Sequence, residues 1–324
     1  NLDDPTIADP SAYFQPTIYT GNGSTQSIDQ GGNSTFSPDF VWIKNRDAAD
    51  DHCLFDTARG ATKLLISNDS DAETTDADTL TAFDSDGFSL GDDDKVNTNT
   101  EKYVGWQWLE SATPGFDIVT YTGNATNRTI SHSLGAVPEL MIVRRYNAVE
   151  NWGVYHGSNT ATPASEALVL DLPNATNPDV VTVWNDTAPT SSVFTVGTGG
   201  MTNSDGGGYI AYLWAGVEVY SKFGSYTGNA SADGPFVWCG FRPSFLFWKN
   251  TNTADDWNIL DDQRSPYNVA DLVLEPNTPD AEVTGSPREI DLLSNGFKVR
   301  GTDSNLNGDG HTLIFAAFAE TPFK

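Results

Sequence analysis

The sequence predicts an all-β protein built from three tandem antiparallel β-sandwich modules of about 100 residues, of jelly-roll or lectin-like type. The phrase Tyr-Thr-Gly-Asn occurs three times, at Tyr19–Asn22, Tyr121–Asn124 and Tyr226–Asn229. Short runs rich in Val, Ile, Phe, Tyr, Trp and Thr follow each copy and are bounded by Gly, Asn, Asp, Pro and Ser, which is typical of strands joined by turns. The length of the repeat indicates three small domains, because the repeats of a solenoid span only a few tens of residues.

Four further landmarks follow the turn in the same order in each copy. They are a Pro-led apolar run, a second apolar run, a short run around one Phe, and a closing run with large aromatic residues, and each is predicted to be a strand. The runs are Pro38–Lys44, His52–Asp56, Gly87–Leu90 and Tyr103–Trp108 in the first copy, Pro138–Arg144, Trp152–His156, Val193–Val196 and Tyr209–Trp214 in the second, and Pro243–Lys249, Trp257–Asp261, Gly296–Val299 and Leu313–Phe318 in the third.

The closing runs show the two-residue period of a strand, so one face of each is predicted to lie in the core. Those faces carry Val104, Trp106 and Trp108 in the first copy, Ile210, Tyr212 and Trp214 in the second, and Ile314, Ala316 and Phe318 in the third. Helix signals are weak. The best are Ser165–Leu170 and Asp261–Leu272, where a turn or a single short helix is expected to interrupt the strands.

The module boundaries follow from the linkers. Ser111–Gly115 is rich in turn residues and separates the first two modules, whereas Val217–Phe223 joins the last two so tightly that little flexibility is expected. The first module also includes an N-terminal arm. The three modules therefore span residues 1–112, 113–220 and 221–324.

The charge of the chain excludes some partners. With 44 acidic against 17 basic residues the formal net charge is −27. Phosphate binding draws on clustered Lys and Arg, and no basic stripe is present, so nucleic acid is excluded as a partner. No stretch approaches the ~20 apolar residues of a membrane helix, so no membrane insertion is expected. The excess of carboxylates predicts either a halophilic or marine source, where such a surface stays soluble, or an ordinary solubilising surface.

The sequence motifs of the first module resemble those of a known family. An Asp-x-x-Arg-Gly element at Asp56–Gly60, an Asp-Gly-Phe-x-Leu-Gly segment at Asp86–Gly91 and an Asn-x-Asn-x-x-x-Tyr-Val-x-Trp-x-Trp ending at Asn97–Trp108 accompany the Pro38–Lys44 run. Together they are similar to an uncharacterised tandem-repeat β module of tailed-virus virion proteins, from marine phages or haloarchaeal viruses, often labelled tail fibre or structural protein. Modules two and three keep the order of the elements but only some of the residues of these motifs. The resemblance implies a virion surface role and no catalytic residues.

From this resemblance we expect a non-enzymatic structural protein at the virion surface or otherwise extracellular, with a tail-fibre or other host-recognition component as the leading interpretation. Repeated rigid modules give multivalent contact without strong single sites. A capsid decoration or turret protein is the alternative in the same class, and a cellular adhesin or secreted carbohydrate-binding protein is the alternative in another. The expected partners are other virion proteins, a host surface receptor or glycan, and further copies of the chain in a homo-oligomer.

Three tryptophans are candidates for glycan binding, because the apolar faces of sugars stack on aromatic rings. They are Trp184, Trp152 and Trp257. Packing in the core is the alternative for Trp152 and Trp257, which lie in predicted strands.

Calcium is the one cofactor for which the sequence offers a candidate site. Asp303, Asn305 and Asn307 present oxygen atoms at alternate positions, with a Gly at the sixth position of the segment, as in the opening of a calcium loop. The twelfth position is Ile314, where that loop requires a Glu. A β-turn before the closing strand is the alternative, because the other two copies have turn residues at the same place.

The repeated turn also supplies three candidate sites of N-glycosylation, at Asn22, Asn124 and Asn229, each of which begins an Asn-x-Ser/Thr sequon. Modification depends on a host that glycosylates surface proteins.

Two Asp-x-x-Arg pairs, Asp56 with Arg59 and Asp261 with Arg264, stand at corresponding places, where the second module has His156 and no Arg. Recognition of an anion and a structural pair that fixes a loop are the two interpretations. No catalytic residues are predicted, since the sequence has no Gly-x-Ser-x-Gly elbow and no phosphate loop. Cys53 and Cys239 are expected to be buried free thiols, because a bridge would require a folded-back, ring-like arrangement of the modules.

Overall fold

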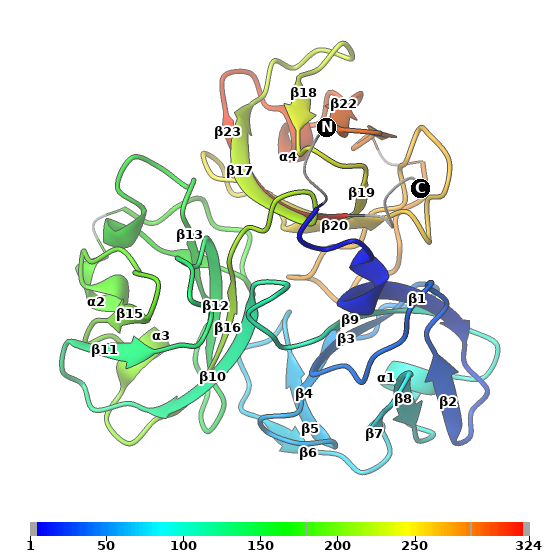
Figure 1. Ribbon diagram of the computed structural model, residues 1–324, viewed down its shortest axis with the longest axis horizontal. Coiled ribbons are helices and arrows are strands. Elements are labelled where there is room, and N and C mark those ends of the chain that lie inside the picture. Colours follow the sequence, from blue (N-terminus) through cyan, green and yellow to red (C-terminus); the bar gives the residue numbers. More distant parts are fainter. Residues whose placement is uncertain (1–4, 179, 286, 320–324) are drawn as a thin grey trace.

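Antiparallel β-strands make up almost all of the regular structure, as the sequence predicts. The computed structural model describes residues 5–178, 180–285 and 287–319. Within these ranges the strands form six sheets, and no strand of one repeat pairs with a strand of another. Figure 1 shows three lobes around a common centre, and we name them lobe 1, lobe 2 and lobe 3 in chain order.

Lobe 1 contains a six-stranded and a three-stranded sheet. Its strands are β1 (Phe14–Thr20), β2 (Gln26–Asp29), β3 (Phe40–Asn45), β4 (Cys53–Asp56), β5 (Lys63–Ile66), β6 (Thr74–Thr75), β7 (Leu80–Asp84), β8 (Gly87–Leu90) and β9 (Lys102–Trp108). The larger sheet has the order β1-β9-β3-β4-β5-β6, and the smaller has the order β2-β8-β7.

Lobes 2 and 3 repeat this plan with fewer strands. The strands of lobe 2 are β10 (Phe116–Thr122), β11 (Arg128–Ser131), β12 (Leu140–Arg145), β13 (Gly153–His156), β14 (Leu168–Val169), β15 (Val193–Val196) and β16 (Gly208–Trp214). Those of lobe 3 are β17 (Ser221–Thr227), β18 (Phe236–Trp238), β19 (Pro243–Asn250), β20 (Asn258–Asp261), β21 (Ile290–Leu293), β22 (Gly296–Val299) and β23 (Thr312–Ala319). The sheets have the orders β10-β16-β12-β13-β14 and β11-β15, then β17-β23-β19-β20 and β18-β22-β21.

The helices are all short. They are the 3-10 turns η1 (Pro10–Ala12) and η2 (Pro163–Ser165), and the single α-turns α1 (Asp94–Asn97), α2 (Val181–Trp184), α3 (Gly200–Asn203) and α4 (Ser304–Asn307). Of the two interruptions expected from the sequence, Ser165–Leu170 contains the end of η2 and the strand β14. The segment Asp261–Leu272 forms turns and no helix. Ser265 N donates to the Asp261 carbonyl as in a first helical turn, but Pro266 has no backbone N–H for the next helical bond.

Strand register identifies equivalent positions in the three lobes. In each lobe the closing strand lies between the first strand and the Pro-led strand. The residue pairs at the start of the first strand are Phe14 opposite Trp108, Phe116 opposite Trp214 and Ser221 opposite Phe318. Other residues of one lobe can be matched to those of the next by counting along the strands from these pairs.

Each large sheet is buried on both faces. One face packs within its own lobe, and the other faces the centre, where side chains of all three lobes form one continuous apolar core. Ring centroids of Trp108 and Trp214 lie 6.2 Å apart, and those of Trp108 and Phe318 lie 5.8 Å apart. The prediction that these three residues are buried is confirmed. They fill the space between the lobes rather than the interior of one sandwich.

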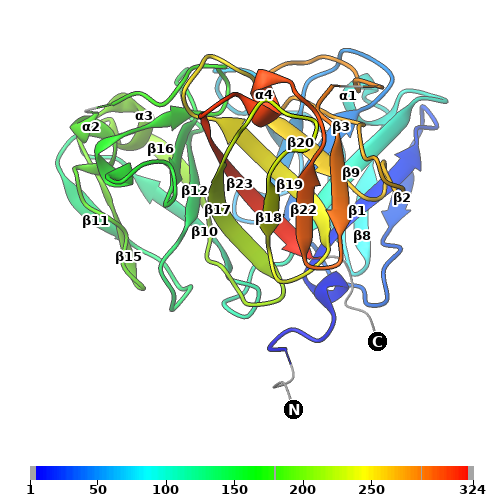
Figure 2. The ribbon, with the colours of Figure 1, turned by 90° about the horizontal axis from the view of Figure 1, so that it is seen from above.

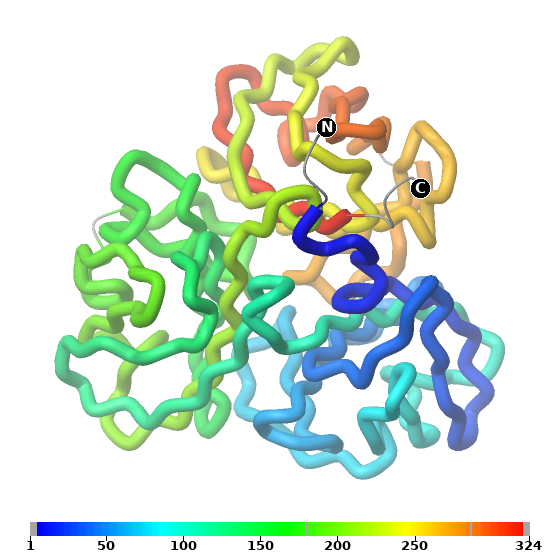
Figure 3. The backbone as a smooth tube through the Cα atoms, viewed as in Figure 1, coloured from blue at the N-terminus to red at the C-terminus, as the bar shows by residue number. Residues whose placement is uncertain are grey.

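The lobes close into a ring. Figure 3 traces the chain from lobe 1 in blue and cyan through lobe 2 in green to lobe 3 in yellow and red, which returns beside lobe 1. A backbone hydrogen bond joins each neighbouring pair of lobes, from Glu73 N to Tyr146 O at 2.8 Å, from Thr176 N to Thr251 O at 3.0 Å and from Glu282 N to Arg46 O at 2.9 Å. Because the third bond joins lobe 3 back to lobe 1, the arrangement is cyclic.

The two sides of the ring differ. In Figure 2, η1 and the end of β23 lie at one side of the molecule, whereas α1, α3 and α4 lie toward the opposite side. The side chains of Phe14 and Phe318, near the start and the end of the described chain, pack with ring centroids 5.1 Å apart. The two ends of the described fold are therefore neighbours.

Candidate functional site

The three tryptophans proposed for glycan binding are all buried. Trp152 donates its indole N–H to the Ile66 carbonyl of lobe 1 at 2.9 Å, and Trp257 donates to the Val169 carbonyl of lobe 2 at 2.7 Å. Trp184 lies in the core of lobe 2. The prediction that these residues bind sugar is wrong for the folded chain, because two of them join lobes and the third packs inside one.

The segment of the calcium candidate forms the single helical turn α4, where the alternative interpretation expected a β-turn. Asp303 caps α4, and its carboxylate accepts a hydrogen bond from Asn305 N at 2.9 Å. Asn307 is buried, accepts a hydrogen bond from Asn229 N at 2.8 Å and donates to the Ser231 carbonyl at 2.8 Å. Its amide is therefore committed to the chain. Among the residues that the structure describes, no group of three or more His, Cys, Asp or Glu could hold a metal ion.

The same buried amide recurs in the other lobes and explains the Tyr-Thr-Gly-Asn repeat. Asn97 accepts from Asn22 N, and Asn203 accepts from Asn124 N, each at 2.9 Å. The Tyr of each repeat donates its hydroxyl to a carbonyl of the adjacent helical turn, Tyr19 to Val96, Tyr121 to Thr202 and Tyr226 to Leu306. The repeated phrase thus fastens the first turn of each lobe to the helical turn before its closing strand.

The three sequon asparagines of the repeated turn are exposed. Each side-chain oxygen accepts a hydrogen bond from the backbone N–H two residues further on, at 2.8 Å for Asn22 and at 3.0 Å for Asn124 and Asn229. Their modification stays a prediction.

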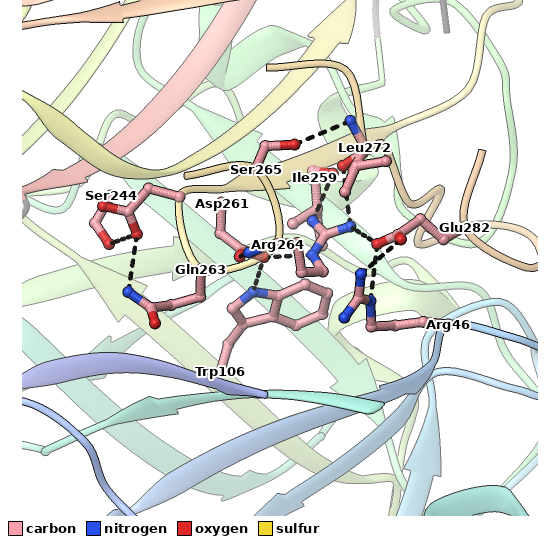
Figure 4. Close-up of polar contacts among 11 residues, drawn as sticks. Arg46, Trp106, Ser244, Ile259, Asp261, Gln263, Arg264, Ser265, Leu272 and Glu282 are labelled. Carbon is pink, nitrogen blue, oxygen red and sulfur yellow. Dashed lines mark hydrogen bonds and ion pairs between the residues drawn. The ribbon is translucent and has the colours of Figure 1, made fainter. Parts of the chain in front are cut away.

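The Asp261–Arg264 pair joins lobe 3 to lobe 1, as Figure 4 shows. Arg264 Nε lies 2.6 Å from Asp261 Oδ2, and the same oxygen accepts the indole N–H of Trp106 at 2.9 Å. The guanidinium also contacts Glu282 at 2.9 Å, and Glu282 pairs with Arg46 of lobe 1 at 2.8 Å. Buried charges need this many partners to offset their desolvation.

Lobe 1 makes the equivalent contact with lobe 2. Arg59 Nε lies 2.6 Å from Asp56 Oδ2, which accepts the hydroxyl of Tyr212 at 2.7 Å. Burial, followed by the adjacent Asp56, raises the pKa of Tyr212 well above its usual value, so the phenol stays a donor. Tyr212 and Trp106 occupy the same position of their closing strands.

The third contact reverses donor and acceptor. The equivalent position in the closing strand of lobe 3 is Ala316, which has no polar group to offer. His156 of lobe 2 stands in place of the Asp, and its Nε2 lies 3.0 Å from the Phe315 carbonyl while Nδ1 accepts from Ser158 N at 3.1 Å. This pattern requires the neutral Nε2–H tautomer. Burial lowers the pKa of His156 to about 4.

These three contacts decide between the two interpretations of the Asp-Arg pairs. Both guanidinium groups are buried and held by carboxylates and carbonyls of the chain, so neither is open to an external anion. The pairs are structural, and they fix lobes as well as loops. The cysteines are both free and buried, as predicted.

Two clefts open between neighbouring lobes. One, of about 350 Å³, lies between lobes 2 and 3. We name it the Trp238 cleft, and its side-chain lining includes Glu139, Glu218, Lys222 and Trp238. The other, of about 270 Å³, lies between lobes 3 and 1 and is named the Asp29 cleft; its lining includes Gln15, Asp29, Ser244 and Gln263.

Trp238 is the residue that the sequence reasoning missed. It is 59% exposed, whereas the other eight tryptophans are at most 4% exposed. It ends β18, an edge strand in which Phe236 and Trp238 face outward and Val237 faces the core. Trp238 combines a large apolar face with access from solvent, and it lies beside a cleft.

The chain as a whole can now be placed in a family. The model of a domain of unknown function, DUF7483, matches residues 9–322, so the chain belongs to this family. A search of curated proteins gave no match. No helix among the described residues is long and apolar enough to cross a membrane.

Proposed function

We propose that this chain is a non-enzymatic structural protein of a virion surface that takes part in host recognition. The class rests on the resemblance of the first module to virion proteins of tailed viruses. The observation that carries the proposal is the closed ring of three lobes, which gives a rigid head with both ends of the described chain at one side.

The ring changes how the repeats serve such a role. Lobes strung in a line would supply reach, but lobes that share one core supply a compact head with similar backbones at three positions. Pseudo-equivalent surfaces around an axis suit multivalent binding. The same symmetry favours one second candidate, a decoration protein seated on a threefold position of a capsid.

Immunogold electron microscopy of gradient-purified particles tests the proposal, with an antibody raised against this chain and one against the major capsid protein as the control. Label at the tail supports host recognition. Label spread over the head supports the decoration protein instead. Particles that carry the control label and lack this chain, both on grids and by mass spectrometry, refute both.

A further inference from the structure

The Trp238 cleft has the size and composition of a small-ligand site. Its volume of about 350 Å³ is in the range of pockets that hold small molecules, roughly 300–1,000 Å³. Lobe 2 contributes Glu139, lobe 3 contributes Lys222 and Trp238, and the linker between them contributes Glu218. The two lobes are fixed to each other by the shared core, so the walls of the cleft are held in place.

The indole of Trp238 packs against Gly240. Gly240 has φ +88°, and a Cβ placed on it would lie 3.1 Å from Cζ2 of Trp238. The ring therefore lies against the bare backbone of Gly240, which a larger residue could not allow without displacing it. Phe236, 47% exposed, lies on the same face of β18 as Trp238. An aromatic platform whose position is set by the backbone loses little freedom when a ligand stacks on it.

The polar groups around the platform are suited to hydroxyls. The Glu139 carboxylate is oriented by a hydrogen bond from Gly216 N at 3.1 Å, so it is positioned before a ligand arrives. Carboxylates accept hydrogen bonds from hydroxyls, and the Lys222 ammonium donates to them. Two carboxylates against one ammonium, on a chain with net charge −27, disfavour acidic sugars.

The neighbouring cleft serves as an internal comparison. By strand register, Trp238 corresponds to Asp29 in lobe 1 and Ser131 in lobe 2, since all three end the strand that pairs with the Phe-containing strand. The Asp29 cleft has Gln15 and Ser244 where the Trp238 cleft has Lys222 and Glu139. It is similar in size and polar, but no aromatic platform stands at the corresponding position.

We infer that the Trp238 cleft binds a neutral oligosaccharide, with one sugar ring stacked on Trp238 and its hydroxyls bound by Glu139 and Lys222. This inference names the ligand of the proposed host-recognition role and rests on that role only for the source of the glycan. Binding by the purified chain is measured without virions, so its failure and the failure of the virion assignment are separate results.

The experiment is a screen of the full chain against neutral oligosaccharides of glucose, galactose and mannose, with acidic oligosaccharides alongside, followed by titration calorimetry of the best probe. Acrylamide quenching of tryptophan fluorescence gives a second readout, because Trp238 alone among the tryptophans is exposed. We expect a neutral probe to bind and to protect Trp238 from the quencher. We expect Trp238→Ala to weaken binding on the order of tenfold or more and Trp238→Phe to restore part of it.

Two variants serve as controls. Tyr267→Ala removes an exposed aromatic ring outside the cleft, and Asp29→Ala alters the comparison cleft. Both should bind as the unmodified chain does. The inference is overturned if no neutral probe binds, if only acidic probes bind, or if Trp238→Ala binds as well as the unmodified chain. It is also overturned if Trp238→Ala changes only self-association, because Trp238 would then be a contact between copies of the chain.

Discussion

Acid should loosen the contact between lobes 2 and 3 through one histidine. Burial lowers the pKa of His156 from its ordinary 6.5 to about 4. An unfolded chain takes up a proton at this residue below pH 6.5, whereas the folded chain does so only near pH 4. The stability that this neutral histidine contributes is therefore fully present above pH 6.5 and is lost as the pH falls toward 4.

The magnitude follows from the two pKa values. Linkage gives a loss of about 2 kcal/mol at pH 5 and about 3 kcal/mol at pH 4, relative to pH 7.5. No carboxylate contributes to the shift of His156, so the effect belongs to this residue and its burial. His52 has a pKa lowered mainly by burial as well, and its effect has the same sign.

The substitution His156→Gln isolates the effect, because an amide can still donate to the Phe315 carbonyl but does not titrate. Urea unfolding of both chains at pH 7.5, 5 and 4, at one ionic strength, gives the free energies of unfolding. We expect the difference between the two chains to shift by about 3 kcal/mol in favour of the variant between pH 7.5 and pH 4. His52 is common to both and cancels. A difference that stays constant with pH would refute the assignment of a buried neutral imidazole.

Three further outcomes are expected. Tyr212→Phe removes a donor from the buried Asp56 carboxylate and should lower the free energy of unfolding by about 2 kcal/mol, whereas the exposed control Tyr267→Phe should change it by less than about 0.5 kcal/mol. Burial and hydrogen bonding to Asp117 raise the pKa of Glu110 to about 7, so its folded form loses stability as the pH rises from 4.5 through 7. Between pH 5 and pH 8 the free energy of unfolding of Glu110→Gln should therefore rise by about 1 kcal/mol relative to that of the unmodified chain, after allowance for solvent screening. An equal response of both chains to pH would contradict this. The Debye length falls from ~30 Å at 0.01 M salt to ~3 Å at 1 M, so repulsion among the carboxylates should weaken over that range. The midpoint of thermal unfolding should therefore rise with salt, and divalent ions should act at lower concentration than sodium. A midpoint that stays flat or falls would mean that the acidic surface is ordinary solubilising charge.

The repeats in the sequence predicted the strands and their buried faces well, because each strand pattern is local. The alternation of Trp106 and Trp108 with smaller residues indicated a buried face, and the structure confirms it. Which partner covers that face is a property of the ring, which local patterns do not encode. Trp152 and Trp257 could therefore be read either as core or as exposed platforms, and only the neighbouring lobe decides.

Trp238 could have been found by comparing the repeats position by position. Phe236-Val237-Trp238 corresponds to Ser27-Ile28-Asp29 in lobe 1 and to Thr129-Ile130-Ser131 in lobe 2. Only the middle position is apolar in all three, so only the middle position is needed by the core. The two flanking aromatics of lobe 3 are apolar where the other lobes are polar, and that contrast is the signal of an exposed site.

The unequal contacts between the lobes give a reason for the divergence of the repeats. Asp56 and Asp261 accept from Tyr212 and Trp106, whereas His156 donates to the backbone beside Ala316. A lobe with Asp placed against Ala316 would lose a donor to its buried carboxylate, at a cost of about 1–3 kcal/mol. His156 placed against Trp106 would bring two N–H donors together. Exchange of lobes within a ring or between two chains is therefore disfavoured by chemistry, although the backbones of the lobes are alike, and the order of the ring is specified by side chains that no longer repeat.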